Sequence, residues 1–238
     1  MAQSVGNAKN ILVGASPLFL SNVDINDSDY ISNVEPGAGL ASSAKNVAVP
    51  AFSTGVSYTT TLNGVDQTSG LFGYRNVGFT NNGLQITYNP TYDSVTVDQL
   101  LDTAKLFKSA MEVMIATEMS EGTLENIVTV FGQSATSLST TGTGTSKVDT
   151  IKIEAGSLGQ APTERQLIAI GQAPTAGTTA TAERIYYARR VLSVQQSQHS
   201  LARTTPTTFP VTFRLLPDAN YSGSEYGKII DRVLTVSS

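Results

Sequence analysis

The stretch GLQITYNPTYDSVTVDQ, residues 83–99, decides the fold class of this chain. Leucine, isoleucine and tyrosine alternate with polar residues over 84–89, and two valines alternate with polar residues over 94–98. A period of two places successive side chains on opposite faces of a β-strand. Between the runs, Asn89–Asp93 has residues that favour turns. The stretch therefore predicts a two-stranded β unit with one apolar face, which needs a core, and one polar face.

The composition predicts a mainly β, globular chain whose surface meets other protein. Its 238 residues allow one large or two small domains, and 40% of them are hydrophobic. Only 14% are charged, compared with about 25% in typical soluble domains. Valine, isoleucine, threonine and tyrosine favour strands. We predict a single domain over residues 1–238.

Charge is distributed unevenly along the chain. The net charge of −4 argues against nucleic-acid binding as the main activity. Residues 84–131 hold seven acids and two lysines, whereas residues 183–214 hold five arginines and one glutamate. These charges are either scattered and solvated, or form complementary patches that meet between subunits. For the second alternative, the candidate interface residues are Arg189, Arg190 and Arg203.

The clearest helix is GTLENIVTVFG, residues 122–132. Thr123 can cap its N-terminus, and Glu125 lies in the first turn, where the helix dipole favours a carboxylate. Gly132 suits the left-handed position after the last turn. The apolar face comprises Leu124, Ile127, Val128 and Phe131.

The other segments are expected to be strands and loops. Alternation predicts strands over 111–119, 150–155, 166–171, 183–194 and 210–216, and an N-terminal strand over 10–20 that is broken near Pro17. Residues 224–238 fit a strand or a short helix. We expect a long extended segment over about 21–70, a loop with a short helical turn over 100–110, and a flexible Thr/Ser/Gly loop over about 133–149.

Motifs for catalysis, metals and cofactors are weak. The chain has no cysteine and one histidine, which leaves no thiolate site and no multi-histidine metal site. GTGTSK, residues 142–147, lacks the Gly-Lys-Ser/Thr ending of a phosphate loop. Glu112 and Glu118 would lie roughly 20 Å apart on one strand, too far for a pair of catalytic carboxylates. The apolar run over 11–20 is too short to span a bilayer. We predict no enzyme activity, cofactor, metal or membrane insertion.

Taken in order, these segments resemble the major tail tube protein of long-tailed (siphovirus-like) bacteriophages. The resemblance lies in β runs ending near Asp98-Gln99, a strand leading into a TLEN helix at 123–126, and a late strand series ending in FRLLPD at 213–218. The opening NAKNILVGASPLFLS, residues 7–21, also fits. Residues 21–70 are longer, and residues 100–110 more apolar, than the family pattern.

The resemblance implies a β-sandwich or barrel flanked by a helix, whose inner sheet joins neighbouring subunits in a ring. Six copies would close each ring, and rings would stack into the tube through which DNA is ejected. Implied partners are tail tip and tail terminator proteins and a tape measure protein inside the tube. The protein would be made in the host cytoplasm and reside in the virion tail.

In such a tube, the polar face would line the lumen. The candidate lumen-facing residues are Gln85, Thr87, Thr96, Asp98, Glu112 and Glu118. A hydrated, anionic wall would repel phosphates and keep DNA from adsorbing. Closing the ring would also remove exposed sheet edges, which otherwise invite aggregation.

Two other classes of function remain open. One is another phage component with a β fold, from the tail end, baseplate or capsid surface. The other is a bacterial adhesin or carbohydrate-binding β-sandwich. An adhesin of that kind should carry a clustered aromatic platform, yet the chain has no tryptophan and its nine tyrosines are dispersed.

Overall fold

A computed structural model describes most of the chain from residue 74 onward and short stretches before it. The described residues are 16–21, 35–37, 46–48, 60–62, 65–67, 74–99, 102–153, 155, 158–159, 161–174, 181–195, 197–199, 201, 203–204 and 206–234. The elements are β1 (Leu18–Ser21), β2 (Glu35–Gly37), β3 (Asn46–Ala48), β4 (Thr60–Leu62), β5 (Val65–Gln67), β6 (Tyr74–Asn76), β7 (Thr80–Val95), β8 (Lys105–Met119), α1 (Leu124–Val130), β9 (Leu138–Thr141), β10 (Val148–Ile151), β11 (Arg165–Gln172), β12 (Thr181–Ser193), β13 (Phe209–Leu215) and β14 (Gly227–Leu234). The prediction of a mainly β fold with one short helix is confirmed for this part of the chain.

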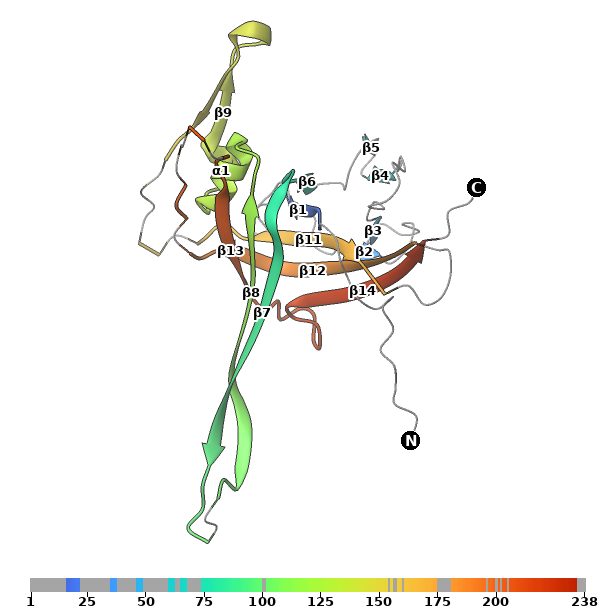
Figure 1. Ribbon diagram of the computed structural model, residues 1–238, viewed down its shortest axis with the longest axis vertical. Helices are drawn as coiled ribbons and strands as arrows, with labels where there is room; N and C mark the ends of the chain where they lie inside the picture. Colours follow the sequence, from blue (N-terminus) through green and yellow to red (C-terminus); the bar gives the residue numbers. More distant parts are fainter. Residues whose placement is uncertain are drawn as a thin grey trace.

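One eight-stranded antiparallel sheet organises the fold. Its order is β6-β1-β11-β12-β13-β8-β7, and β14 also pairs with β12. Residues 181–188 of β12 pair with β14, whereas residues 191–193 pair with β13. The sheet therefore divides along β12. In Figure 1, β11, β12 and β14 run across the molecule, while β7, β8 and β13 run along its longest axis.

The two parts of the sheet enclose the main hydrophobic core. One part contributes Leu18 and Leu167, and the other contributes Ile115 and Phe213; all four are at most 3% exposed. A second apolar cluster, on the opposite face of β1, β11 and β12, contains Phe19, Ile168, Ile170, Ile185 and Tyr187. The strand predictions for 166–171, 183–194 and 210–216 are confirmed as β11, β12 and β13.

The stretch over residues 83–99 does not form two short strands joined by a turn. Residues 80–95 form one continuous 16-residue strand, β7, which pairs with the 15-residue β8. The predicted turn at 89–93 is therefore wrong, because pairing with β8 overrides the local turn preference. Pro90 is accommodated because β7 is an edge strand of the described sheet. The chain reverses beyond Val95 instead.

The expected loop over 100–110 is also wrong in its second half. β8 begins at Lys105, so residues 105–110 are strand, and Leu100 and Leu101 lie outside the described residues. The prediction that residues 111–119 alternate between core and surface is confirmed, since Val113, Ile115 and Met119 are buried. A bulge interrupts the pairing: Thr91 faces Ala110 but Tyr92 faces Lys108, which leaves Ser109 without an opposite residue.

Helix α1 follows β8 as predicted. The amide of Asn126 donates to Thr123 Oγ1 at 3.3 Å, which confirms the cap, and Gly132 has the left-handed φ of 67°. The buried face differs from the prediction, since Asn126, Val128, Thr129 and Val130 are buried and Phe131 is 43% exposed. The helix is too short to be stable alone, so its contacts with the sheet matter.

Arg75, from β6, fastens α1 to the sheet. Its Nη2 donates to the carbonyl of Glu125 at 2.9 Å and to Thr129 Oγ1 at 2.6 Å. Burial, followed by the nearby charge of Arg165, lowers the pKa of Arg75 to about 10, partly offset by Glu125. The group therefore stays cationic at neutral pH, and its hydrogen bonds persist.

The remaining expectations are partly corrected. The Thr/Ser/Gly segment contains a strand, β9, which pairs with β10; the strand expected at 150–155 is thus found at 148–151. Residues 227–234 form strand β14 rather than a helix. In the segment 21–70, β2 pairs with β3 and β4 with β5, each over three residues, and most other residues lie outside the described ranges, as do residues 10–15.

Candidate functional site

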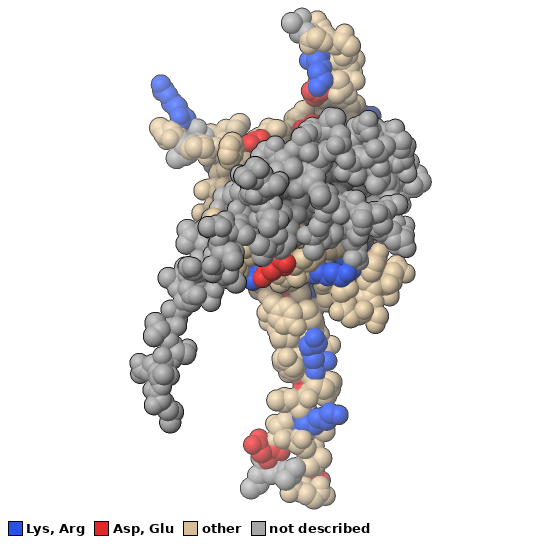
Figure 2. Space-filling model, turned by 90° about the vertical axis from the view of Figure 1, so that its right-hand side faces the viewer, with Lys and Arg blue, Asp and Glu red and all other residues tan. Residues whose placement is uncertain are grey.

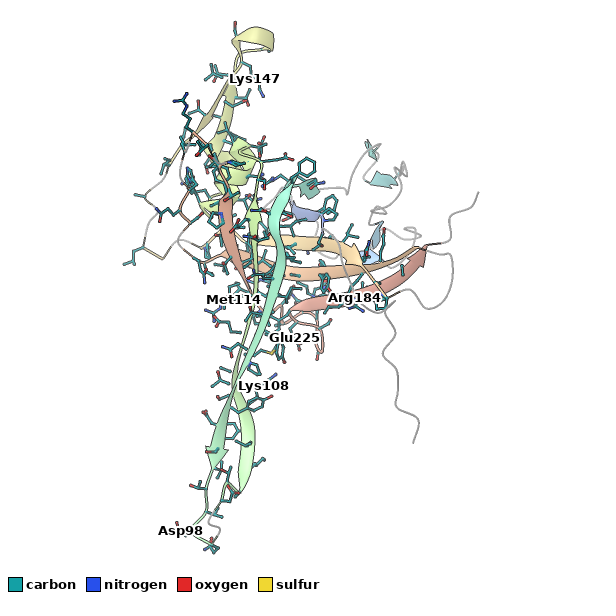
Figure 3. All side chains as sticks on the ribbon, viewed as in Figure 1. Asp98, Lys108, Met114, Lys147, Arg184 and Glu225 are labelled. Atoms are coloured by element: carbon teal, nitrogen blue, oxygen red, sulfur yellow. The ribbon has the colours of Figure 1, made fainter. Side chains whose placement is uncertain are left out.

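The β7–β8 hairpin extends well beyond the body of the molecule. Asp98 lies at its far end, Lys108 part-way along it and Met114 where it meets the body (Figure 3). We call residues 91–99 and 102–110 the arm; every one of them is exposed. An isolated two-stranded hairpin is marginally stable in water, because nothing packs on either face. The arm is therefore a candidate for contact with another molecule.

One face of the hairpin is polar. Residues directly opposite each other in an antiparallel pair lie on the same face, and the register pairs Gln85 with Ala116 and Asn89 with Glu112. Strand β13 extends this face on the other side of β8, where Pro210 lies opposite Glu118. We call this surface the polar face; its polar residues are Gln85, Thr87, Asn89, Glu112, Glu118, Thr212 and Arg214. The register thus brings together four of the six residues that the sequence predicts for the lumen.

The other two predicted lumen residues lie elsewhere. Thr96 and Asp98 follow the end of β7, and Asp98 is at the tip of the arm (Figure 3). Ten residues of strand lead from Gln85 to Val95, which corresponds to roughly 33 Å, and Asp98 lies beyond the end of that strand. The separation arises because residues 89–93 continue the strand instead of turning back.

The charge of the polar face is more balanced than the sequence suggests. Glu112 Oε1 lies 3.5 Å from Nη1 of Arg214, and both side chains are partly exposed. Glu118 Oε2 accepts only a long hydrogen bond, 3.4 Å, from the Asn81 amide. Glu118 is therefore the carboxylate on this face that has no cation partner within the described part of the chain.

A shallow polar hollow lies beside Glu118. Its volume is about 140 Å³, and Gln85, Gln195 and Thr212 contribute to its lining. The Thr212 hydroxyl donates to Gln195 Oε1 at 2.8 Å. Typical small-molecule pockets have about 300–1,000 Å³ and mainly apolar walls, so this hollow is not suited to an organic ligand.

The opposite, inner face of the hairpin is apolar. Ile86 lies opposite Ile115 and Tyr88 opposite Val113, so both share a face with core residues. Here the hairpin and β14 form a groove of about 330 Å³, lined mainly by apolar side chains, including Met111, Leu215, Tyr226 and Ile229. The sequence analysis misses this groove, because alternation shows that a face is apolar but not whether its own chain covers it.

Two of the three candidate interface arginines have partners in their own chain. Arg189 is 2% exposed; its guanidinium lies 3.5 Å from the Tyr221 ring centroid, and Nε donates to the Ser224 carbonyl at 2.9 Å. Arg190 forms a bidentate pair with Glu164, at 2.6 and 2.9 Å. Arg203 is exposed. A subunit contact through Arg189 would require residues 221–224 to move.

Neither a metal centre nor a spanning helix is found in the described ranges. No three His, Asp or Glu side chains there come together as a metal site would require. Among the described helices, none is long and apolar enough to cross a membrane. Comparison with protein-family models gives no match, and comparison with curated protein sequences gives no relative. The two faces of the hairpin are therefore the features of the described chain that bear on function.

Proposed function

We propose that this chain is a structural virion protein that assembles into stacked hexameric rings, the tail tube of a long-tailed bacteriophage through which DNA is ejected. The observation that carries the proposal is the β7–β8 hairpin, which over residues 85–89 and 111–118 is polar on one face and apolar on the other, and which extends beyond the body with its arm exposed. A hairpin of this length is stabilised when neighbouring subunits supply its missing layers.

The polar face would line the lumen at the level of Gln85, Thr87, Glu112 and Glu118. Neutral amides and hydroxyls hydrate such a wall without attracting phosphate, and Glu118 adds repulsion. Arg214 would not hold DNA strongly, because Glu112 lies 3.5 Å away and offsets its charge. The wall would thus let DNA pass.

The edge of β7 would serve ring closure. In the described sheet, β7 is the last strand of the order, so its outer edge has backbone groups available for pairing. A neighbouring subunit that adds a strand there would continue the sheet around the ring. The proposal requires no cofactor and no catalytic residue; tail tip, tail terminator and tape measure proteins would be its partners in the virion.

Electron microscopy of the purified protein over a range of concentrations tests the proposal. Rings with six subunits, or open-ended tubes, are the expected result. A chain that remains monomeric at every concentration and salt, including after addition of a tail tip complex as initiator, would refute it. Closed particles without tubes would favour the alternative of a tail-end or capsid-surface component.

A further inference from the structure

An apolar stripe runs along the inner face of the hairpin, from the groove to the arm. We call it the inner stripe; its members are Ile86, Tyr88, Tyr92, Leu106 and, across the groove, Ile229. Their exposed fractions range from 43% for Ile86 to 67% for Ile229. Such a run of exposed apolar side chains is unusual, because most large apolar residues of a folded chain are covered.

The arm residues belong to the same face as the groove. Side chains alternate along β7, so Ile86, Tyr88 and Tyr92 lie on the same face of this strand. The bulged residue, Ser109, is on β8 and does not interrupt the alternation of β7. Tyr92 lies opposite Lys108, and Lys108 Nζ is 3.3 Å from Met111 Sδ, a groove side chain. Leu106, two residues before Lys108, is therefore on this side as well.

The size of the stripe matches an interaction surface. A large aromatic side chain has about 150–250 Å² to bury, so Tyr88 and Tyr92, each 58% exposed, together leave roughly 200 Å² uncovered. With the three aliphatic side chains, the stripe reaches the roughly 300–600 Å² of the largest apolar patch on a typical monomer, a patch that is often functional. That is a large part of the roughly 800 Å² per partner of a standard protein interface.

The charges of the arm identify a fitting partner. The arm carries three carboxylates and two ammonium groups, all exposed: Asp93, Asp98, Asp102, Lys105 and Lys108. Both signs of charge lie along it, with acidic side chains near the tip (Figure 2). A second arm placed alongside can offer a partner of opposite sign to both ammonium groups and to two of the three carboxylates. The hairpin of another copy is thus complementary in charge as well as in apolar surface.

We propose that the inner stripe is the contact on which the hairpin of a second copy of this chain packs, while the polar face stays in solvent. This inference rests on the proposed self-assembly and names the surface that carries it. It also gives the hairpin an orientation in the assembly, with the inner stripe towards the neighbouring subunit. The apolar groove would then be closed by the neighbouring subunit.

Matched substitutions at adjacent positions separate the two faces. Tyr88→Lys adds a cation on the inner stripe, and Thr87→Lys adds the same cation on the polar face; Tyr92→Lys and Thr91→Lys repeat the comparison on the arm. The inner substitutions should raise the concentration needed for assembly by about 10-fold or more, as expected for a buried aromatic anchor. The outer ones should leave it within about 3-fold. The arm pair lies beyond the core, so it tests assembly even if Tyr88→Lys impairs folding.

Thiol labelling gives a second, independent measurement, because the chain has no cysteine. Maleimide should label Tyr92→Cys at least about 10-fold more slowly in the assembly than in the free subunit, since the side chain becomes buried. It should label Thr91→Cys at similar rates in both. Assembly with equal labelling at both positions, or with protection of both, would overturn this inference while leaving the proposed function intact. Absence of assembly in the unmodified protein would overturn the proposed function itself.

Discussion

Replacing Arg189 with methionine should destabilise the isolated subunit by about 3 kcal/mol. The change removes a hydrogen bond from a charged donor to the Ser224 carbonyl, 2.9 Å long, which contributes about 1.5–3 kcal/mol. It also removes a cation–π contact at 3.5 Å from the Tyr221 ring, which contributes up to about 2 kcal/mol when desolvated. Methionine keeps an apolar side chain similar to the aliphatic part of arginine, so a change in packing should contribute little to the change in the free energy of unfolding.

Urea unfolding at a concentration where the subunit is monomeric measures this loss, and thermal unfolding should show a decrease in Tm of about 10 °C for a chain of this length. Arg203→Met is the control: Arg203 is exposed, so its substitution should change the free energy of unfolding by less than about 0.5 kcal/mol. A double-mutant cycle with Tyr221→Leu should give a coupling energy of about 1–2 kcal/mol.

An Arg189→Met subunit that unfolds at the same urea concentration as the unmodified subunit but no longer assembles would contradict this role of Arg189. That result would return Arg189 to the subunit interface, where the sequence analysis puts it. Loss of stability with an unchanged m-value, together with assembly of the remaining folded subunits, supports its role as a clamp on residues 221–224.

Three further predictions concern the polar face, a turn and acid stability. Glu118→Lys should leave assembly intact and cause DNA to adsorb inside the tubes, with strong salt dependence. Asp98→Lys, at the arm tip, should affect assembly more than DNA retention. Gel-shift and salt titration of the tubes distinguish the two variants. Gly78→Ala should cost about 1–3 kcal/mol, because φ is +84° and the added methyl meets the Glu121 carboxylate; chemical denaturation measures it. Hydrogen bonds from Arg184 lower the pKa of Asp231, so its contribution is complete above the ordinary aspartate pKa of about 4 and is lost as pH falls through the lowered value. Asp231→Asn should therefore make the free energy of unfolding depend less on pH at acidic pH. The effect should be small, because the Arg184–Asp231 pair is partly exposed. An unchanged pH dependence would contradict this prediction.

The alternation of residues 111–119 predicts strand β8 correctly, and the cap at Thr123 predicts helix α1 correctly, because both signals depend only on residues close together in the sequence. Side chains in that strand meet the core on every second position, and a threonine cap needs only the amide three residues later. The turn expected at 89–93 fails for the opposite reason. Asparagine, proline and aspartate favour turns locally, but β8 supplies a pairing partner for each position, and an edge strand tolerates proline.

The environment of a side chain is harder to predict than its strand. Arginines are mostly exposed, and the sequence gives no sign that Arg189 is enclosed by Tyr221 and Ser224, more than thirty positions later in the chain. The same holds for the groove, since its lining combines residues of β7, β8, β12, β13 and β14. The sequence does predict the polar face, because Gln85, Thr87, Glu112 and Glu118 alternate with core residues on two strands that pair.

Pro90 helps explain how such a hairpin can exist before assembly. A long exposed edge strand is a template for aggregation, because its backbone donors and acceptors are available to any other strand. Proline has no N–H, so β7 cannot offer a complete ladder past residue 90. The bulge at Ser109 of β8 also disturbs the pairing of β7 at the step from Thr91 to Tyr92. Pairing by a neighbour is thus favoured along residues 85–89, next to the body, because the register breaks between Asn81 and Gln85, while the arm beyond is left to make contacts through its side chains. If the proposed assembly is correct, Pro90 separates two kinds of subunit contact on one strand: backbone pairing before it and packing of the inner stripe after it.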